Sequence, residues 1–146
     1  MVNDHLSRYI SLAAEPDEGL RKIKGVLDVA KFVNTEEMEW KKSPVNTDIM
    51  AVTGNKIGGL LARLEKGTTM DPHKHIEEQL GFVIQGAVEW VVGPKLKSHI
   101  TKAGTFYFFE SNEIHGVRNT FKRTILLDMF GPPIKALNHL AVRMHK

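Results

Sequence analysis

Short apolar runs between residues 46 and 131 constrain the fold more than any other feature of this chain. They are rich in β-branched and aromatic residues, and Gly, Asn, Ser and Pro separate them; examples are TDIMAVT, LGFVIQG, AVEWVVG, GTFYFFE and FKRTILLDMFG. The segments 53–56 (TGNK) and 85–86 (QG) have the composition of hairpin turns. Because no helical pattern separates these candidate strands, the sequence predicts an all-β sandwich or barrel.

The two ends of the chain have a different periodicity. Apolar residues within 4–14 recur at the spacing of an amphipathic helix. After Pro133, which suits a first helical position, an apolar stripe continues to Met144. We therefore expect three parts: a helical N-terminal extension over residues 1–40, a barrel over 41–131 and a C-terminal helix over 132–146.

The composition suits one soluble domain. The chain has 146 residues, of which 42% are hydrophobic and 25% charged, as is usual for a globular domain. It has no cysteine, which excludes disulfides and thiolate metal sites and fits a reducing compartment. Neither a signal-peptide pattern nor an apolar run of about 18 residues is present. We expect a cytoplasmic protein that does not interact with membranes.

The charge pattern gives no indication of a nucleic-acid partner. The net charge is +3, and the basic residues are scattered among acids in segments such as LRKIKG, KLKSH and FKR. No segment combines aromatic and basic residues as RNA-binding motifs do. A solvated surface of mixed charge is the expected result, and a small molecule is the expected partner.

Two histidines one residue apart, His73 and His75, form the most informative local pattern. In a strand, residues i and i+2 point to the same face, so both imidazoles enter one space. Neutral imidazole is the commonest side-chain ligand for metals such as Zn, Ni, Fe and Cu. A metal site is one interpretation of the pair, and two buried, hydrogen-bonded strand histidines without metal are the alternative.

The surroundings of this pair match a longer, two-part pattern. The first segment places Gly67, His73, His75, Gln79 and Gly86 with five, one, three and six residues between them. The second places Gly104, His115 and Asn119 with ten and three residues between them. Over roughly residues 45 to 131 this arrangement resembles the paired motifs of the cupin superfamily. Glu110 and Asn112 stand where the second motif has Pro and Gly.

The resemblance to cupins implies a double-stranded β-helix, or jelly-roll barrel, with one divalent transition metal ion inside. By this resemblance His73, His75 and His115 are metal ligands, and Gln79 stands where most cupins have an acidic ligand. HKHIEEQLGFVIQG also resembles the pectin-degradation cupins of the KdgF type, in which the glutamine is itself a ligand. Zn, Ni, Fe, Mn and Cu all suit such a site. A glutamine that only packs and hydrogen-bonds is the alternative.

Three further residues are candidates for the substrate pocket. The segment LLDMFGPP resembles the D-x-F-x-P-P segment of the same cupins, which implies that Asp128 and Phe130 line the pocket. Their spacing of two on one strand puts both on one face. Asp128 is the candidate catalytic residue, with a structural hydrogen-bond acceptor as the alternative. Phe130 is a candidate substrate-binding residue, and Arg63 is a second one if it reaches the barrel mouth to bind an anion.

One departure from the family pattern affects the expected substrate. The pectin-degradation cupins carry an arginine after the prolines, where this chain has Ile134. An arginine is the natural partner of a substrate carboxylate, so its loss puts a uronate substrate in doubt. Gln79 in place of an acid leaves a divalent ion its full +2 charge, which favours polarisation of a substrate oxygen.

We therefore expect a metal-dependent enzyme that acts on a small oxygenated substrate such as a sugar acid, by keto–enol conversion or isomerisation. An Fe(II) three-histidine dioxygenase is one alternative, and a non-catalytic cupin that binds a small ligand is another. Because the open face and strand edges of such a barrel are usually covered, we expect a homodimer.

Overall fold

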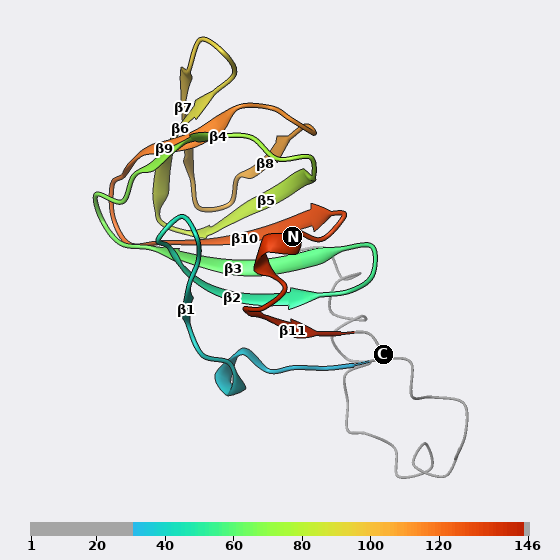
Figure 1. Cartoon of the computed structure of the whole chain (residues 1–146). Coiled ribbons are helices and arrows are strands. Elements are labelled where there is room, and N and C mark those ends of the chain that lie inside the picture. Colours follow the sequence, from blue (N-terminus) through green and yellow to red (C-terminus); the bar gives the residue numbers. More distant parts are fainter. Residues whose placement is uncertain (1–30, 145–146) are drawn as a thin grey trace, which may run out of the picture. The chain divides into compact units, whose positions relative to one another are not determined.

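The computed structural model describes residues 31–144, so the helix expected within residues 4–14 lies outside the described range. Phe32–Lys146 form one compact unit, and its described strands lie in two sheets (Figure 1). Only short 3-10 turns interrupt the strands, among them η3 (Thr35–Glu37), whose N-cap Asn34 accepts a hydrogen bond from Glu36 N–H. The predicted all-β class is confirmed. No helix among residues 31–144 is long and apolar enough to cross a membrane.

The larger sheet has seven strands. Its main path runs β1-β2-β3-β10-β5-β8, and β11 pairs with β2 off that path. All pairs are antiparallel except β11 with β2. The strands are β1 (Lys41–Lys42), β2 (Asp48–Thr53), β3 (Gly58–Leu64), β5 (Glu78–Gln85), β8 (Phe106–Phe109), β10 (Thr124–Gly131) and β11 (Ala141–Arg143).

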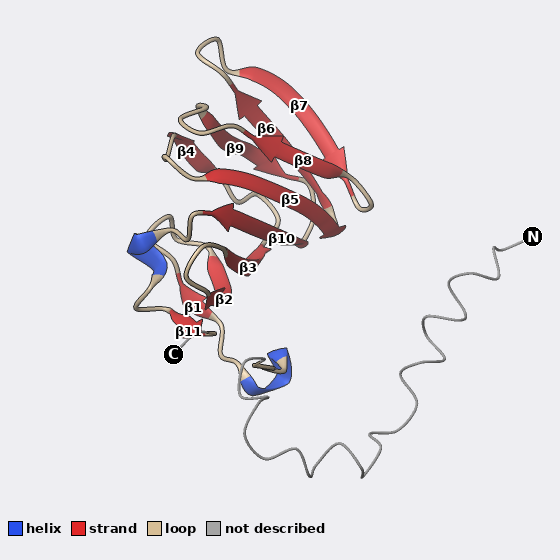
Figure 2. Ribbon diagram, turned by 90° about the vertical axis from the view of Figure 1, so that its right-hand side faces the viewer, coloured by secondary structure: helices blue, strands red, loops and turns tan. Residues whose placement is uncertain are grey.

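The smaller sheet has four strands in the order β4-β9-β6-β7, all antiparallel. They are β4 (Met70–His73), β6 (Ala87–Val92), β7 (Lys97–Lys102) and β9 (His115–Thr120). Figure 2 shows β7, β6 and β9 on one side of the unit and β2, β3 and β10 on the other. Consecutive strands therefore cross repeatedly between the two sheets.

Side chains from both sheets fill the space between them. On β3, burial alternates strictly along the strand, so Leu60, Ala62 and Leu64 face the interior. The core also includes Val83 and Val88, which are fully buried. This period of two follows from the pleat of a strand, and it decides which residues can reach the space between the sheets.

The two turns predicted from the sequence join strands as expected. Residues 53–56 lie between β2 and β3, and Gly54 N–H donates to Ile57 C=O at 2.8 Å. Gly86 joins β5 to β6 with a φ of +92°. A Cβ there would overlap Thr124, so both the backbone angle and the close approach require glycine.

The helix expected over residues 132–146 is not formed. The described part of this segment contains the 3-10 turn η4 (Lys135–Leu137) and then β11. β1 pairs with only the first two residues of β2, and β11 pairs with Ala51–Thr53 along the same strand (Figure 2). The hydrogen bonds that β11 makes with the backbone of Ala51–Thr53 outweigh the weak helical propensity of the C-terminal segment. The apolar side chains of this segment still pack against the core; they are Ile134, Leu137, Leu140 and Ala141.

Candidate metal centre and cavity

Three histidines converge at one end of the space between the sheets. His73 ends β4 and His115 begins β9, and the two are paired directly across these antiparallel strands. His75 follows in the loop after β4. One ring nitrogen from each lies within 4.8 Å of the others. Two segments about forty residues apart thus form one cluster of imidazoles.

Each of these histidines is held by a backbone carbonyl. The Nδ1 atoms of His73, His75 and His115 lie 2.8, 2.9 and 2.9 Å from the carbonyl oxygens of Asp71, Glu77 and Glu113. A carbonyl can only accept, so each Nδ1 carries the proton and each neutral ring keeps a lone pair on Nε2. Such contacts fix the orientation of metal-binding histidines.

The electrostatics of the site favour a neutral ring on His115. Burial lowers the pKa of His115 to about 4, and the neighbouring His73 and His75 act in the same direction, although the hydrogen bond to Glu113 C=O opposes them. His115 is therefore neutral at neutral pH, as a metal ligand must be. Glu77 is buried beside His75, with Oε2 3.6 Å from its Nδ1, whereas Glu78 is exposed.

Gln79 approaches this cluster from the opposite sheet. It lies on β5 with 6% of its surface exposed, and its Nε2 donates to Asp128 Oδ1 at 2.8 Å. Its Oε1 consequently faces His75, 3.2 Å from Nε2. With the proton of His75 on Nδ1, both His75 Nε2 and Gln79 Oε1 carry lone pairs, and neither atom has a proton to donate to the other. A cation bound by both would relieve this repulsion, so the donor set fits a divalent metal.

Asp128 lies next to Gln79 on the interior face of β10. It is 5% exposed, and its Oδ1 accepts hydrogen bonds from Gln79 and, at 2.6 Å, from the hydroxyl of Tyr107. Burial raises the pKa of Asp128 to about 6, although both hydrogen bonds favour the carboxylate. Burial and the adjacent Asp128 also raise the pKa of Tyr107, so its phenol keeps the proton that it donates.

A cavity of about 230 Å³ lies between the sheets beside these groups. The three histidines, Gln79 and Asp128 all border it. Phe130 also borders it and meets the ring of His75 edge-on, with centroids 5.7 Å apart. Most of the remaining wall is apolar: Pro44, Val45, Ile49, Leu60, Ala62, Leu64, Met70, Trp90, Val117, Leu126, Ile134, Ala136 and Leu137. The site therefore combines a polar end with an apolar body.

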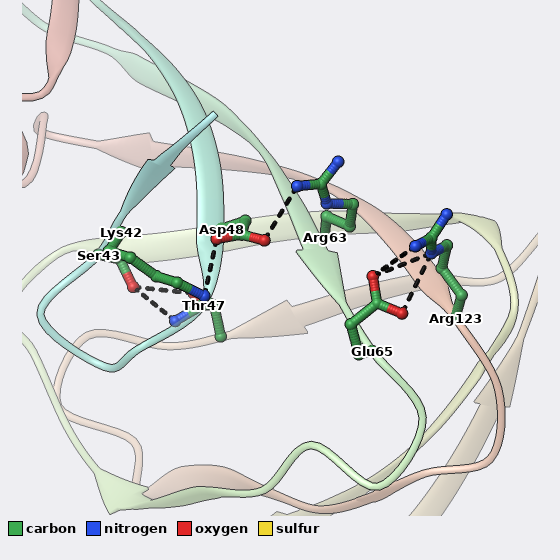
Figure 3. A network of polar contacts seen from close by, with 7 residues as sticks. All are labelled: Lys42, Ser43, Thr47, Asp48, Arg63, Glu65 and Arg123. Atoms are coloured by element: carbon green, nitrogen blue, oxygen red, sulfur yellow. Dashed lines mark hydrogen bonds and ion pairs between the residues drawn. The ribbon is translucent and has the colours of Figure 1, made fainter. Parts of the chain in front are cut away.

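Arg63 does not reach this cavity, and the substrate-binding role expected for it is not supported. Leu60, Ala62 and Leu64 face inward on β3, so the pleat turns Arg63 to the outer face. There its Nη2 donates to Asp48 Oδ2 at 3.0 Å (Figure 3). Its guanidinium also lies over the ring of Trp40, 4.4 Å from the centroid.

Sequence reasoning gave no role in the site to Tyr107 or Gly81. The hydroxyl of Tyr107 nevertheless contacts Asp128. Gly81 lies between them in register, paired with Asp128 on one side and Tyr107 on the other. Gly81 itself is a sequence signal of this contact, because a glycine in the middle of a strand often marks the close approach of another group. His99 and His139, which lie outside both motifs, are exposed.

The fold and the site define the class of protein. Residues 60–130 match the cupin domain family, and the fold is similar to that of an RmlC-like cupin with a double-stranded β-helix from Methanocaldococcus jannaschii. That structure aligns with a TM-score of 0.57 and 17% identity over 78% of this chain and 99% of the other. Residues 60–130 form a cupin domain, and the expected double-stranded β-helix is confirmed.

Among cupins, the chain is similar to the pectin degradation protein KdgF. It is 37% identical to KdgF of Dickeya dadantii over 68 residues, which are 46% of this chain and 60% of that protein. The alignment thus spans less than two thirds of the curated relative. The structure of KdgF from Halomonas sp. aligns with a TM-score of 0.66 and 19% identity, over 73% of this chain and 97% of the other.

Proposed function

We propose that the chain is a metal-dependent enzyme that interconverts the enol and keto forms of a small oxygenated substrate. One observation carries this proposal: the buried carboxyl of Asp128 borders the same cavity as a convergent set of metal-ligand atoms. Such an arrangement places a proton-transfer group beside a site for the substrate oxygen. Similarity to the pectin degradation protein KdgF makes sugar-acid derivatives one substrate class to test.

The ligand residues have distinct tasks in this proposal. His73, His75, His115 and Gln79 would hold one divalent transition metal ion. When bound, that ion supplies Lewis-acid polarisation of a substrate oxygen. The backbone carbonyls of Asp71, Glu77 and Glu113 keep the imidazoles oriented, and the apolar wall limits water in the cavity.

Asp128 would move the proton. In the direction from enol to keto, its carboxylate accepts the proton of the enol O–H, whose electron pair forms the C=O bond. The carboxyl then delivers the proton to the other carbon of the former double bond, so atoms and charge balance. Tyr107 and Gln79 donate to the same oxygen, Oδ1, and leave Oδ2 for the substrate. Tyr107 therefore positions the carboxyl without contacting the reacting atoms.

The proposal is tested with the metal-loaded full chain and its Asp128→Asn variant. Enolisable keto acids and unsaturated uronates serve as substrates, with loss of enol absorbance and deuterium uptake from D2O as readouts. General acid–base catalysis contributes roughly 10²- to 10⁴-fold, so the variant should lose at least about 100-fold in turnover while it retains metal. Glu78→Gln, on the exposed face of the same strand as Gln79, is the control. Equal turnover in both variants would overturn the role of Asp128.

A three-histidine dioxygenase is the second candidate. It is favoured by the absence of any carboxylate from the cluster of ligand atoms found among residues 31–144. The two reactions differ in their need for oxygen. Turnover of the Fe(II)-loaded chain that continues under anaerobic conditions supports the keto–enol reaction, whereas turnover that stops supports the dioxygenase. Ligand binding without turnover under either condition would indicate a binding cupin.

We also propose that the chain forms a homodimer through the outer face of the seven-stranded sheet. Two rows of paired residues cross this face and are apolar throughout: Met50, Leu61, Leu127, Phe82 and Phe106 in one, and Val52, Gly59, Met129, Leu80 and Phe108 in the other. Phe106 is 69% exposed and Phe108 is 51% exposed. Met50 is buried, and the other side chains of these rows are partly or fully exposed. A contiguous apolar surface of this kind is typical of an interface.

A further inference from the structure

The residues that line the cavity indicate the chemistry of the body of the ligand, which is the part away from its metal-binding oxygens. We infer that the site takes an enolisable carbonyl compound whose body is apolar, with about the size of one substituted ring or a branched chain, and not a polyhydroxylated sugar acid. The inference deepens the proposed function and rests on it only for the oxygen-bearing end of the ligand. Three observations support it.

First, the few polar side chains of the wall outside the ligand cluster already have partners within the protein. Trp90 donates its only side-chain N–H, on Nε1, to Thr101 Oγ1 at 2.9 Å. Ser43 and Thr47, the two hydroxyl side chains of the wall, hydrogen-bond to each other at 2.8 Å. Sugar hydroxyls entering this space would exchange most of their hydrogen bonds to water for contacts with apolar side chains, which is costly in a buried site.

Second, no lysine or arginine among residues 31–144 borders the cavity. Ile134 forms part of the wall, and Arg63 points away toward Asp48. Lys135 and Arg143 border a second, open hollow on the other side of His75, Ile134 and Ala136, which line both spaces. A carboxylate on the distal end of a ligand would therefore be buried in the cavity without a cationic partner, which strongly disfavours it.

Third, the size of the cavity limits the ligand. Its volume is about 230 Å³, whereas a dry cavity of roughly 150 Å³ accepts benzene and pockets for drug-sized ligands begin at about 300 Å³. A single ring with two adjacent oxygens fits between these limits. Leu60, Leu64, Val117 and Leu126 supply the apolar surface that its body would contact.

The test uses three hydroxamic acids that share one chelating group and differ only in the body. Zinc-loaded full chain is titrated calorimetrically with acetohydroxamic, benzohydroxamic and gluconohydroxamic acids. Because burial of each CH2 group contributes about 0.8 kcal/mol, the benzoyl compound should bind at least about 10-fold tighter than the acetyl compound. The gluconyl compound should bind no tighter than the acetyl compound. Equal affinity of the first two, or tightest binding of the gluconyl compound, overturns the inference.

A metal-free arm separates this inference from the proposed function. Uptake of 4-fluorotoluene by the metal-free chain, followed by 19F NMR, depends on the apolar wall and not on the metal. We expect saturable binding that is lost in Ala62→Met, which fills the cavity, and kept in Leu61→Met, on the outer face of the same strand. Binding of 4-fluorotoluene without hydroxamate binding would refute the metal site alone. Absence of saturable binding in the wild-type chain would refute the apolar ligand.

The outer hollow provides the remaining control. If a sugar acid used Lys135 for its carboxylate, galacturonate at millimolar concentration would displace benzohydroxamic acid from the zinc-loaded chain, and Lys135→Ala would abolish this displacement. That result overturns the inference. We expect no displacement, and equal affinities of the wild type and Lys135→Ala for benzohydroxamic acid.

Discussion

The hydroxyl of Tyr107 donates a 2.6 Å hydrogen bond to Asp128 across an intervening strand. The two residues lie on β8 and β10, and β5 runs between them with Gly81 in the same row. Because Gly81 has no side chain, the tyrosine ring crosses above it and reaches the carboxyl. A glycine in a structural strand thus determines the position of the candidate catalytic group.

The first prediction concerns this glycine. A Cβ at residue 81 would overlap the ring of Tyr107, so Gly81→Ala should displace the ring and break its contact with Asp128. Overpacking of this kind costs about 1–3 kcal/mol in the free energy of unfolding, measurable by urea denaturation. Gly59→Ala is the control, because a Cβ there meets Val52 at an ordinary 3.6 Å. Equal stability of the two variants would contradict the argument.

The second prediction concerns the metal. His73→Ala should bind zinc or nickel at least 100-fold more weakly than the wild type, because it removes one of three imidazoles that converge within 4.8 Å. Metal content after dialysis against a weak chelator, determined by elemental analysis, measures this. His99→Ala is the matched control, since His99 lies exposed on β7. Retention of one metal ion per chain by both variants would exclude His73 as a ligand.

The third prediction concerns the glutamine. Gln79→Glu adds an anionic donor and should bind the metal more tightly, but the metal then retains less positive charge and should polarise the substrate less. Turnover should therefore fall. The new carboxylate would also replace an amide that donates to Asp128 at 2.8 Å, so the two acids would compete for one proton. Metal titration that shows equal affinities for the two proteins would count against this account.

The fourth prediction concerns the pH dependence of stability in the metal-free protein. The folded chain raises the pKa of Asp128 from 3.8 to about 6, so this carboxyl costs stability as the pH rises through that window and the full cost remains above it. The cost is on the order of 3 kcal/mol, from about 1.4 kcal/mol per pKa unit. Asp128→Asn removes it. The free energy of unfolding of the variant, relative to wild type, should therefore rise between pH 4 and 7.

The titration of His115 does not affect the comparison between Asp128→Asn and the wild type. Its pKa is lowered to about 4, so its contribution to stability is lost as the pH falls from about 6.5, which is the opposite direction. Both proteins contain His115, and its effect cancels in the difference between them. A difference that stays constant from pH 4 to 7 would show that Asp128 is not perturbed in the folded chain.

The fifth prediction concerns the dimer. Phe106→Glu introduces a charge into the apolar outer face of the seven-stranded sheet and should convert a dimer to a monomer, as measured by sedimentation velocity. Ile100→Glu is the control, because Ile100 is equally exposed but lies on β7 of the other sheet. A wild-type chain that sediments as a monomer, or a Phe106→Glu chain that remains dimeric, would refute this interface.

The sequence predicted those strands whose side chains carry the apolar pattern. β2, β3, β5, β6, β8 and β10 coincide with the apolar runs, since one or both of their faces are buried. β7 has no such signal because its residues are almost all exposed. β4 and β9 contain polar residues that bring His73 and His115 together, and their pairing depends on contacts far apart in sequence.

The direction of single side chains was harder to predict than the strands. Apolar residues occur on both faces of β3, so its composition alone does not show that Arg63 points outward. At the C-terminal end, the apolar stripe that continues to Met144 predicts a helix, whereas the segment forms η4 and β11. The open part of β2, which β11 pairs with, is a tertiary feature that the local sequence does not encode.

The donor atoms of the candidate site are divided between the two layers of the barrel. His73 and His115 belong to the four-stranded sheet, and Gln79 belongs to the seven-stranded sheet. An ion held by all three joins the layers at the end where the cavity lies, much as a disulfide would, in a chain that has no cysteine. Heat resistance should then rise and fall with the supply of that ion.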